Sequence, residues 1–595
     1  MFKIIKAFSA TLFFLLLNNL LVAQGIDMYA QASEMTDIMV RYREDRGSLV
    51  RFYSTTLPFS QGQQFSQGPQ YNSPERRKRL TELIDNYQSQ LKSAPFDKMN
   101  VNGKVDYVLF KRNIDDERNQ LEKEEESYQA VKQYLGFSDR IYEMEKPRRR
   151  GAVVNGEKIA AEMNDIRKDI NKAISALAKD SAMEMSRAVL ASSSVRALQG
   201  VLRNYFSFYN GYDPMFTWWV PKTYTVLDST LGIYATVLRN KGKDMTARKP
   251  DASGIKGNPI GREKLITQLK LEFIPYTPED LVAIANAEFA WCDAELLKAS
   301  KEMGFGDNWK QAQEKVKNSY VPPGSQPEAM YKLYQESIDF LKKNDLVSIP
   351  ALAEETWRMN MMSAERQLVS PFFLGGEALI ISYPTNTMDY EEKMMSMRGN
   401  NPHFSRATVH HELIAGHHLQ QFMTNRSKTY RDFSTAFWVE GYALYWEMIL
   451  WDKKFPRSPE DRMGMLFWRM HRCARIIFSL NYHLGRWTPQ ECIDFLVDRV
   501  GHERANAEGE VRRSFEGGYG PLYQIAYMIG GLQLYNLKKE LVDSGKLTYK
   551  QYHDAIFREN AMPIELLRVI LTDQPIKRDF KTSWRFYNQG KELTK

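Results

Sequence analysis

The chain has 595 residues, which is too long for one simple core, so two or more packed units are expected. Its apolar fraction of 43% and charged fraction of 26% are typical of a soluble globular protein. The formal charge is +8, and Lys and Arg are spread along the chain apart from one short cluster at residues 146–150. This distribution argues against a nucleic-acid-binding protein, which more often has a sustained basic face.

The N-terminus predicts export. Lys3 and Lys6 precede a nearly uncharged apolar run from Ala7 to Ala23, and polar sequence follows. This is the pattern of a secretory signal peptide, here residues 1–24. The alternative is a membrane anchor, but the run is short for a bilayer span and contains Asn18 and Asn19. We expect a periplasmic or secreted protein without stable membrane insertion.

Helical signals dominate the rest of the chain. Stretches 105–135 and 281–302 have helical periodicity and few breakers. Four further segments place a Ser or Thr cap before a Pro at the first helical position. They begin at Ser73, Thr277, Ser458 and Thr488. The sequence therefore predicts a mostly α-helical protein.

Strand signals are scarce, and the clearest is Ala378–Tyr383, which follows two glycines and ends at a proline. Loops rich in Gly, Pro, Ser and Gln occupy 60–73, 241–262 and 319–327. We place a boundary in the second loop, between an N-terminal helical region (25–255) and a catalytic region (256–595).

The three cysteines are widely spaced and form no CxxC pair, so no thiolate zinc site or redox motif is predicted. A Cys473–Cys492 disulfide and three buried free thiols both remain open.

Five of the nine histidines gather between residues 403 and 418, and neutral His is the commonest zinc ligand. Glu412 follows His411 directly, as in zinc-binding helices in which the Glu faces the water that the metal activates. The next histidine of that motif is His417, at i+6 instead of i+4. On a regular helix such residues lie about 9 Å apart along the axis and about 120° apart around it.

A shared metal therefore requires a break in the helix, which is cheapest at Gly416. The pairs His411/His418 and His410/His417 are at i+7 and would also need a kink.

A third ligand is expected from the apolar stretch 437–448, where Glu440 and Glu447 stand among aromatic and aliphatic residues. A buried carboxylate needs a metal or a cation as its partner. Glu440 suits a helix–loop–helix return to the metal, and Glu447 could orient a ligating His. The alternative is a surface-exposed His-rich helix that binds metal adventitiously.

These residues resemble the bacterial family known as domain of unknown function 885, which itself resembles the gluzincin metallopeptidases, a group that includes thermolysin and carboxypeptidase Taq. The family pattern HExxPGHxxQ followed by EGWALY corresponds to HELIAGHHLQ (His411–Gln420) and EGYALY (Glu440–Tyr445). The resemblance implies a multi-helix gluzincin-like fold with a small β-sheet beside the active-site helix. It implies Zn²⁺ held by His411, His417 and Glu440, with Glu412 as base. Ala415 replaces the family's proline. Dipeptidyl peptidase three enzymes, with HELLGH, also have a stretched zinc helix.

The resemblance continues downstream. It implies His483 and Tyr527 as groups that stabilise the oxyanion, although Ser479 replaces the family's acid near His483. His418 is a further candidate beside the metal or the substrate. Arg512 and Arg513 could bind a substrate carboxylate, which would favour carboxypeptidase action, or pair with nearby Glu residues.

The leading hypothesis is an exported zinc peptidase that acts on short peptides. The alternatives are a catalytically inactive relative that binds peptide and a non-peptidase hydrolase with the same metal site. An intact Glu412 speaks against inactivity. The end of the peptide that is attacked and the oligomeric state are not decided by the sequence.

Overall fold

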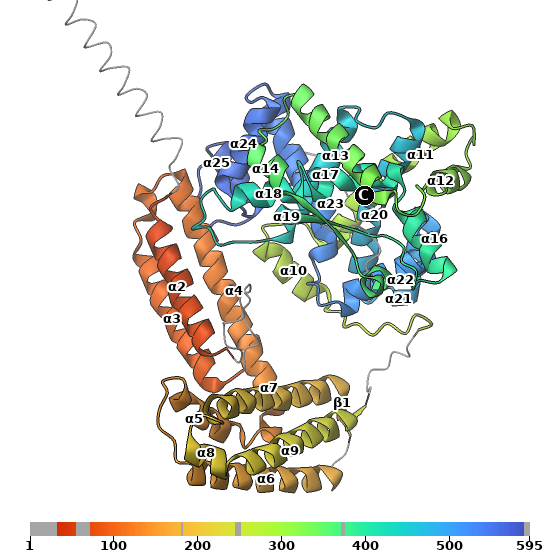
Figure 1. The fold of residues 1–595 in the computed structure, drawn as a ribbon. Coiled ribbons are helices and arrows are strands. Elements are labelled where there is room, and N and C mark those ends of the chain that lie inside the picture. Colours follow the sequence, from red (N-terminus) through yellow and green to blue (C-terminus); the bar gives the residue numbers. More distant parts are fainter. Residues whose placement is uncertain (1–31, 55–71, 180–181, 244–250, 370–374, 588–595) are drawn as a thin grey trace, which may run out of the picture. The chain divides into compact units, whose positions relative to one another are not determined.

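The computed structural model describes residues 32–54, 72–179, 182–243, 251–369 and 375–587, and nearly all its regular structure is helical (Figure 1). This agrees with the predicted fold class at the level of mostly α. The expected signal peptide lies outside the described residues. Within the described part of the chain, no helix is both long and apolar enough to cross a bilayer.

The chain divides into two compact units. The large unit comprises Met1–Thr36, Phe96–Leu109 and Pro250–Lys595, and the small unit comprises Asp37–Pro95 and Phe110–Lys249. The sequence predicted a single division near residue 255. In the structure, Phe96–Leu109 also belongs to the large unit, although it lies between two segments of the small unit in the sequence.

The small unit is an assembly of helices around its own apolar core. That core includes Ile166, Val195, Leu202, Leu231 and Tyr234, all nearly inaccessible to solvent. Its elements are α2 (Thr36–Phe52), α3 (Pro74–Ser93), α4 (Val101–Val131), η2 (Lys132–Tyr134), α5 (Ser138–Arg148), α6 (Gly156–Lys179), β1 (Met183–Glu184), α7 (Met185–Tyr209), α8 (Pro214–Trp219), α9 (Pro221–Asn240) and β2 (Gly242–Lys243). The first residue of α2 and the first part of α4 belong to the large unit.

The large unit contains the histidine cluster. Its elements are η1 (Phe96–Lys98), α10 (Arg262–Leu271), α11 (Pro278–Glu302), α12 (Trp309–Lys317), α13 (Gln326–Lys343), α14 (Ala351–Thr356), β3 (Arg358–Met361), α15 (Ala364–Val369), β4 (Ala378–Ile381), α16 (Tyr390–Gly399), α17 (Pro402–Glu412), α18 (His417–Thr424), α19 (Ala436–Asp452), α20 (Pro459–His483), α21 (Pro489–Phe495), η3 (Leu496–Val500), α22 (Arg504–Glu516), α23 (Tyr523–Lys538), η4 (Lys539–Asp543), α24 (Tyr549–Glu559) and α25 (Ile564–Leu571).

Cap chemistry explains where many of these helices begin. The side chains of Ser73, Thr277, Ser458 and Thr488 each accept a hydrogen bond from a backbone N–H in the first turn, as predicted. Pro at the start of each helix costs nothing, because its missing N–H would have no helical partner.

The predicted strand at Ala378–Tyr383 is observed as the shorter β4. It pairs in parallel with β3, with Arg358 opposite Ala378 and Met361 opposite Ile381. The two strands form a small sheet, in which β3 precedes Gly375 and Gly376 in the chain and β4 follows them.

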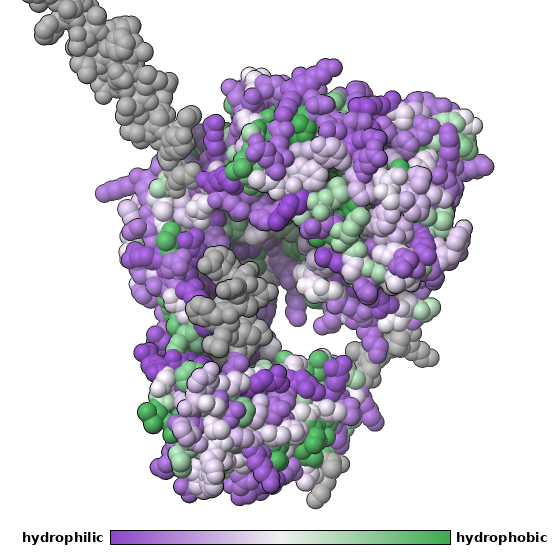
Figure 2. Space-filling view, viewed as in Figure 1, coloured by the Kyte–Doolittle hydropathy of each residue, from purple (hydrophilic) through white to green (hydrophobic). Residues whose placement is uncertain are grey.

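Helices α19 and α23 meet backbone to backbone in the interior of the large unit. A Cβ on Gly441 would lie 2.6 Å from the Cα of Gly530, so only glycine permits this approach. The three cysteines are buried and free. The face visible in Figure 2 is mainly hydrophilic, with hydrophobic residues in small separate patches.

Candidate metal centre

The histidine-rich segment Pro402–Thr424 consists of two helices joined by a tight turn. Helix α17 begins at the Asn401 cap, whose side chain accepts from two backbone N–H groups, and ends at Glu412. Helix α18 begins at His417, so residues 413–416 form the interruption that the i+6 spacing required. A Cβ at Gly416 would overlap the carbonyl oxygen of His411. Glycine therefore allows the chain to turn back over the end of α17.

This turn brings together His411 and His417, one of the three histidine pairs considered. The ligand atoms of His411, His417 and Glu440 all lie within 4.8 Å of one another. Glu440 Oε2 is 3.2 Å from His417 Nε2 and 3.7 Å from His411 Nε2. Tetrahedral zinc with bonds of about 2.0–2.1 Å separates its ligand atoms by about 3.4 Å. Two imidazoles and one carboxylate at these distances fit a zinc ion with an open fourth position.

Glu447 orients the first histidine. His411 Nδ1–H donates to Glu447 Oε1 at 2.7 Å, which leaves Nε2 directed at the cluster. Arg472 Nη2 lies 3.4 Å from the same carboxylate oxygen. Burial alone would lower the pKa of the His411 imidazole, but hydrogen bonds with Glu440 and Glu447 raise it to about 9. A metal would take the place of that proton.

Glu412 is the last residue of α17 and is buried beside the cluster. Burial raises the pKa of its carboxyl above the usual value, and the neighbouring imidazoles oppose this. Gly375 packs directly on it, since a Cβ there would overlap the Glu412 carboxylate. A buried carboxylate with a raised pKa is suited to accept a proton at neutral pH.

Two tyrosines from one face of α23 complete the site. Tyr523 OH donates to Glu440 Oε1 at 2.6 Å, and its oxygen lies 3.0 Å from Tyr527 OH. Because Tyr523 has one O–H and gives it to Glu440, Tyr527 is the donor between the two hydroxyls. The Tyr527 ring is nearly parallel to that of His411, 16° apart with centroids 6.2 Å apart. Sequence reasoning selected Tyr527 and missed Tyr523, whose i, i+4 spacing was the available signal.

Two arginines of α20 were also missed. Arg472 and Arg475 lie over the Tyr527 ring, 4.6 and 4.5 Å from its centroid. Burial raises the pKa of Tyr527 to about 12, even though these cations act in the opposite direction. Tyr527 therefore keeps its proton at neutral pH and can donate it in a hydrogen bond.

The remaining predicted residues have other contacts. His483 ends α20, and its ring lies against Tyr482 and Phe515. No contact of His483 within the described residues reaches His411, His417 or Glu440, and its catalytic role stays a prediction. The ring nitrogens of His418 lie 3.2 Å from the Gly376 carbonyl and 2.8 Å from that of Ala353, so this histidine anchors the loop beside Glu412.

The two candidate carboxylate-binding arginines are already paired. Arg513 Nε lies 2.8 Å from Glu510, and Arg512 Nη1 donates to Glu516 at 3.0 Å. The sequence left open whether these arginines bind a substrate carboxylate or pair with nearby glutamates, and in the structure they form the ion pairs.

The comparisons with known proteins add a family and a fold. No curated protein matches the chain. Among solved structures, a candidate lipoprotein of unknown function from Shewanella oneidensis is similar, with a TM-score of 0.64 and 14% identity over 91% of this chain and 100% of that one. A candidate lipoprotein from Colwellia psychrerythraea has a TM-score of 0.56 and 14% identity over 91% of this chain and 98% of that one. The family described as "Bacterial protein of unknown function (DUF885)" matches residues 61–571, and the chain therefore belongs to this family.

Proposed function

We propose that this protein is an exported, gluzincin-like, zinc-dependent peptidase that hydrolyses short peptides. The observation that carries the proposal is the convergence of His411, His417 and Glu440 from three helices, with Glu412 buried beside them. Clusters of this donor type with one open position are typical of catalytic zinc. The similarity to candidate lipoproteins agrees with export.

A bound Zn²⁺ would supply Lewis-acid chemistry, which acidifies a water molecule and polarises a carbonyl. Glu412 is then the base, and one of its carboxylate oxygens takes a proton from the attacking water. Tyr527 rotates its O–H from Tyr523 toward the oxygen of the substrate carbonyl as charge develops there. Glu412 returns the proton to the leaving nitrogen. Arg472 and Arg475 hold the Tyr527 ring in position from its face.

The test combines metal content with activity. Purified wild type is expected to contain one zinc per chain and to cleave members of a mixed peptide library. Glu412→Gln should retain zinc and lose about 10²–10⁴-fold in rate, because only the base is removed. Glu440→Gln should lose zinc. The matched control is Glu355→Gln in α14, an exposed carboxylate outside the site.

A wild type without stoichiometric zinc contradicts the metal assignment. A wild type that holds zinc but leaves every peptide intact contradicts the peptidase assignment and leaves the metal site standing.

A further inference from the structure

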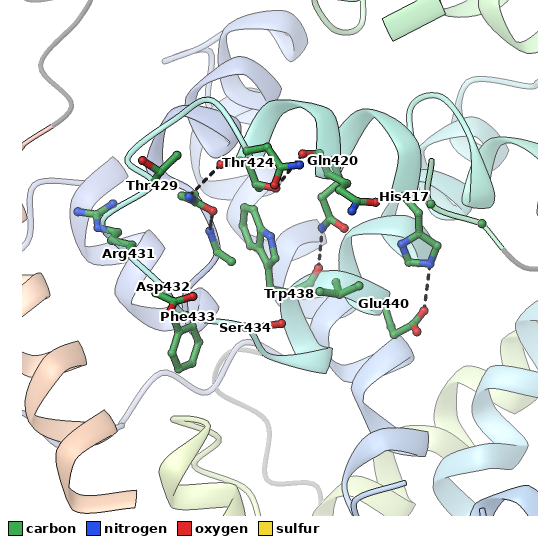
Figure 3. A pocket seen from close by; sticks show the side chains of 17 residues that line it. His417, Gln420, Thr424, Thr429, Arg431, Asp432, Phe433, Ser434, Trp438 and Glu440 are labelled. Carbon is green, nitrogen blue, oxygen red and sulfur yellow. Dashed lines mark hydrogen bonds and ion pairs between the residues drawn. The ribbon is translucent and has the colours of Figure 1, made fainter. Parts of the chain in front are cut away.

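A pocket of about 650 Å³ opens beside the candidate metal centre. Such a volume is typical of ligand sites. Figure 3 shows His417 and Glu440 at one end of this pocket and Asp432 and Phe433 toward the other, with Trp438 between them. The walls also carry neutral polar side chains: Gln420, Gln421, Thr424, Asn425 and Ser434.

The fixed charge in this pocket is negative. Arg431 lines it, but its guanidinium is neutralised by Asp106 at 2.6 Å and by Glu559 at 2.8 Å. Asp432 is exposed in the wall and has no hydrogen-bond or ion-pair partner in the described ranges of the chain. Glu440 at the other end is held by His411, His417 and Tyr523, so Asp432 is the unpaired carboxylate among the described residues that line the pocket.

The loop that carries Asp432 is held in place. Asn560 donates from its side-chain amide to the carbonyls of Thr424 and Ser427 at 3.1 and 2.7 Å. Phe433 N–H donates to the Arg431 carbonyl at 2.8 Å, which makes Asp432 the central residue of a three-residue turn. Asp432 is thus presented from a fixed loop, and little ordering is needed when it binds a partner.

We propose that this pocket binds the positively charged amino-terminal group of a peptide, with Asp432 as its counter-ion. The inference rests on the proposed function and makes it an exopeptidase-type enzyme that acts near the amino end. A free carboxyl terminus is disfavoured at the end of the pocket that carries Asp432, because it would face this carboxylate while Arg431 is already paired with Asp106 and Glu559. The peptide chain would then pass Trp438 and reach His417 and Glu440 a few residues from its start.

Binding without turnover gives the direct test. The Glu412→Gln protein, with and without added Zn²⁺, is titrated by calorimetry with one short peptide in three forms. These have a free amino terminus, an acetylated terminus, and an acetylated terminus with Lys at the second residue. Each titration is repeated with Asp432→Asn added, and with Asp339→Asn as the control, an exposed aspartate of α13.

Acetylation should weaken binding about fivefold, as expected for a partly solvated ion pair, and Asp432→Asn should abolish this difference. Asp339→Asn should leave it unchanged. Equal affinity for free and acetylated peptides overturns the inference. Recovery of affinity by the lysine form also overturns it, because a side-chain cation would then be the ligand.

Turnover by the wild-type protein separates the two proposals. Preferential binding of free amino termini without cleavage contradicts the peptidase assignment alone. Cleavage that is equally fast for free and acetylated peptides contradicts the amino-terminal assignment alone.

Discussion

Replacing Glu447 by Gln tests whether the buried contacts around the metal cluster serve metal binding. Glu447 accepts a 2.7 Å hydrogen bond from His411 Nδ1. A hydrogen bond to a charged group contributes about 1.5–3 kcal/mol and a neutral one about 0.5–1.5 kcal/mol. The loss of charge therefore costs about 1–1.5 kcal/mol, which weakens zinc binding about tenfold. Changes in residues that orient a metal ligand typically cost ~10–100-fold.

The assay is a competition titration of Zn²⁺ against a chromophoric chelator at neutral pH. Glu355→Gln is the control. Because Glu447 is also close to Arg472, urea unfolding of the metal-free variant must show that it still folds cooperatively. A folded Glu447→Gln protein with zinc affinity within about twofold of wild type would refute the reasoning, since the hydrogen bond would then contribute nothing to the metal.

Three further predictions concern the same segment. In the metal-free protein the pKa of His411 is about 9, so zinc must displace a proton from this imidazole when it binds below that pH. The affinity for zinc should therefore rise with pH up to about 9. A zinc affinity that does not change with pH in chelator titrations would contradict this. The sign for stability is opposite: a raised folded pKa stabilises the metal-free protein below the unfolded pKa of about 6.5, and urea midpoints should fall as pH rises from there to about 9. Gly416→Ala should lower the free energy of unfolding of the large unit by about 1–3 kcal/mol, because the new Cβ would overlap the His411 carbonyl oxygen. The control is Gly520→Ala, where a Cβ meets open space and stability should not change. Equal urea midpoints for the two variants would argue against this turn.

Local chemistry made the histidine segment predictable. Two histidines six residues apart cannot share one metal ion on a regular helix, so a shared ion predicted a break between His411 and His417. Gly416 marked where the chain could turn, and the structure has the break there. The four Ser and Thr caps were equally readable, because a cap is decided by residues within one turn of each other. Glu440 was found because a carboxylate in an apolar stretch needs a partner.

Contacts between elements that are distant in the sequence could not be predicted from it. The i, i+4 spacing places Tyr523 beside Tyr527 on α23. Its contact with Glu440 depends on how α19 and α23 meet at Gly441 and Gly530, and no pattern within α23 predicts that register. The partner of β4 is β3, Arg358–Met361, which is mostly exposed and lacks the apolar alternation of a predicted strand. Asp432 escaped notice because an exposed aspartate in a loop is ordinary until a pocket is seen around it.

The contact between Gly441 and Gly530 also bears on which ions the site can accept. No side chain lies between the backbones of α19 and α23 at this point, so the α19 backbone that carries Glu440 cannot shift there through a rotamer change at the contact. His411 is held by Glu447, whereas His417 is the more exposed of the two imidazoles and follows the turn at Gly416. A larger or smaller divalent ion would therefore be accommodated by movement of His417. If a metal binds here, a difference in ionic radius would be taken up on the side of α18, while Glu440 keeps its position.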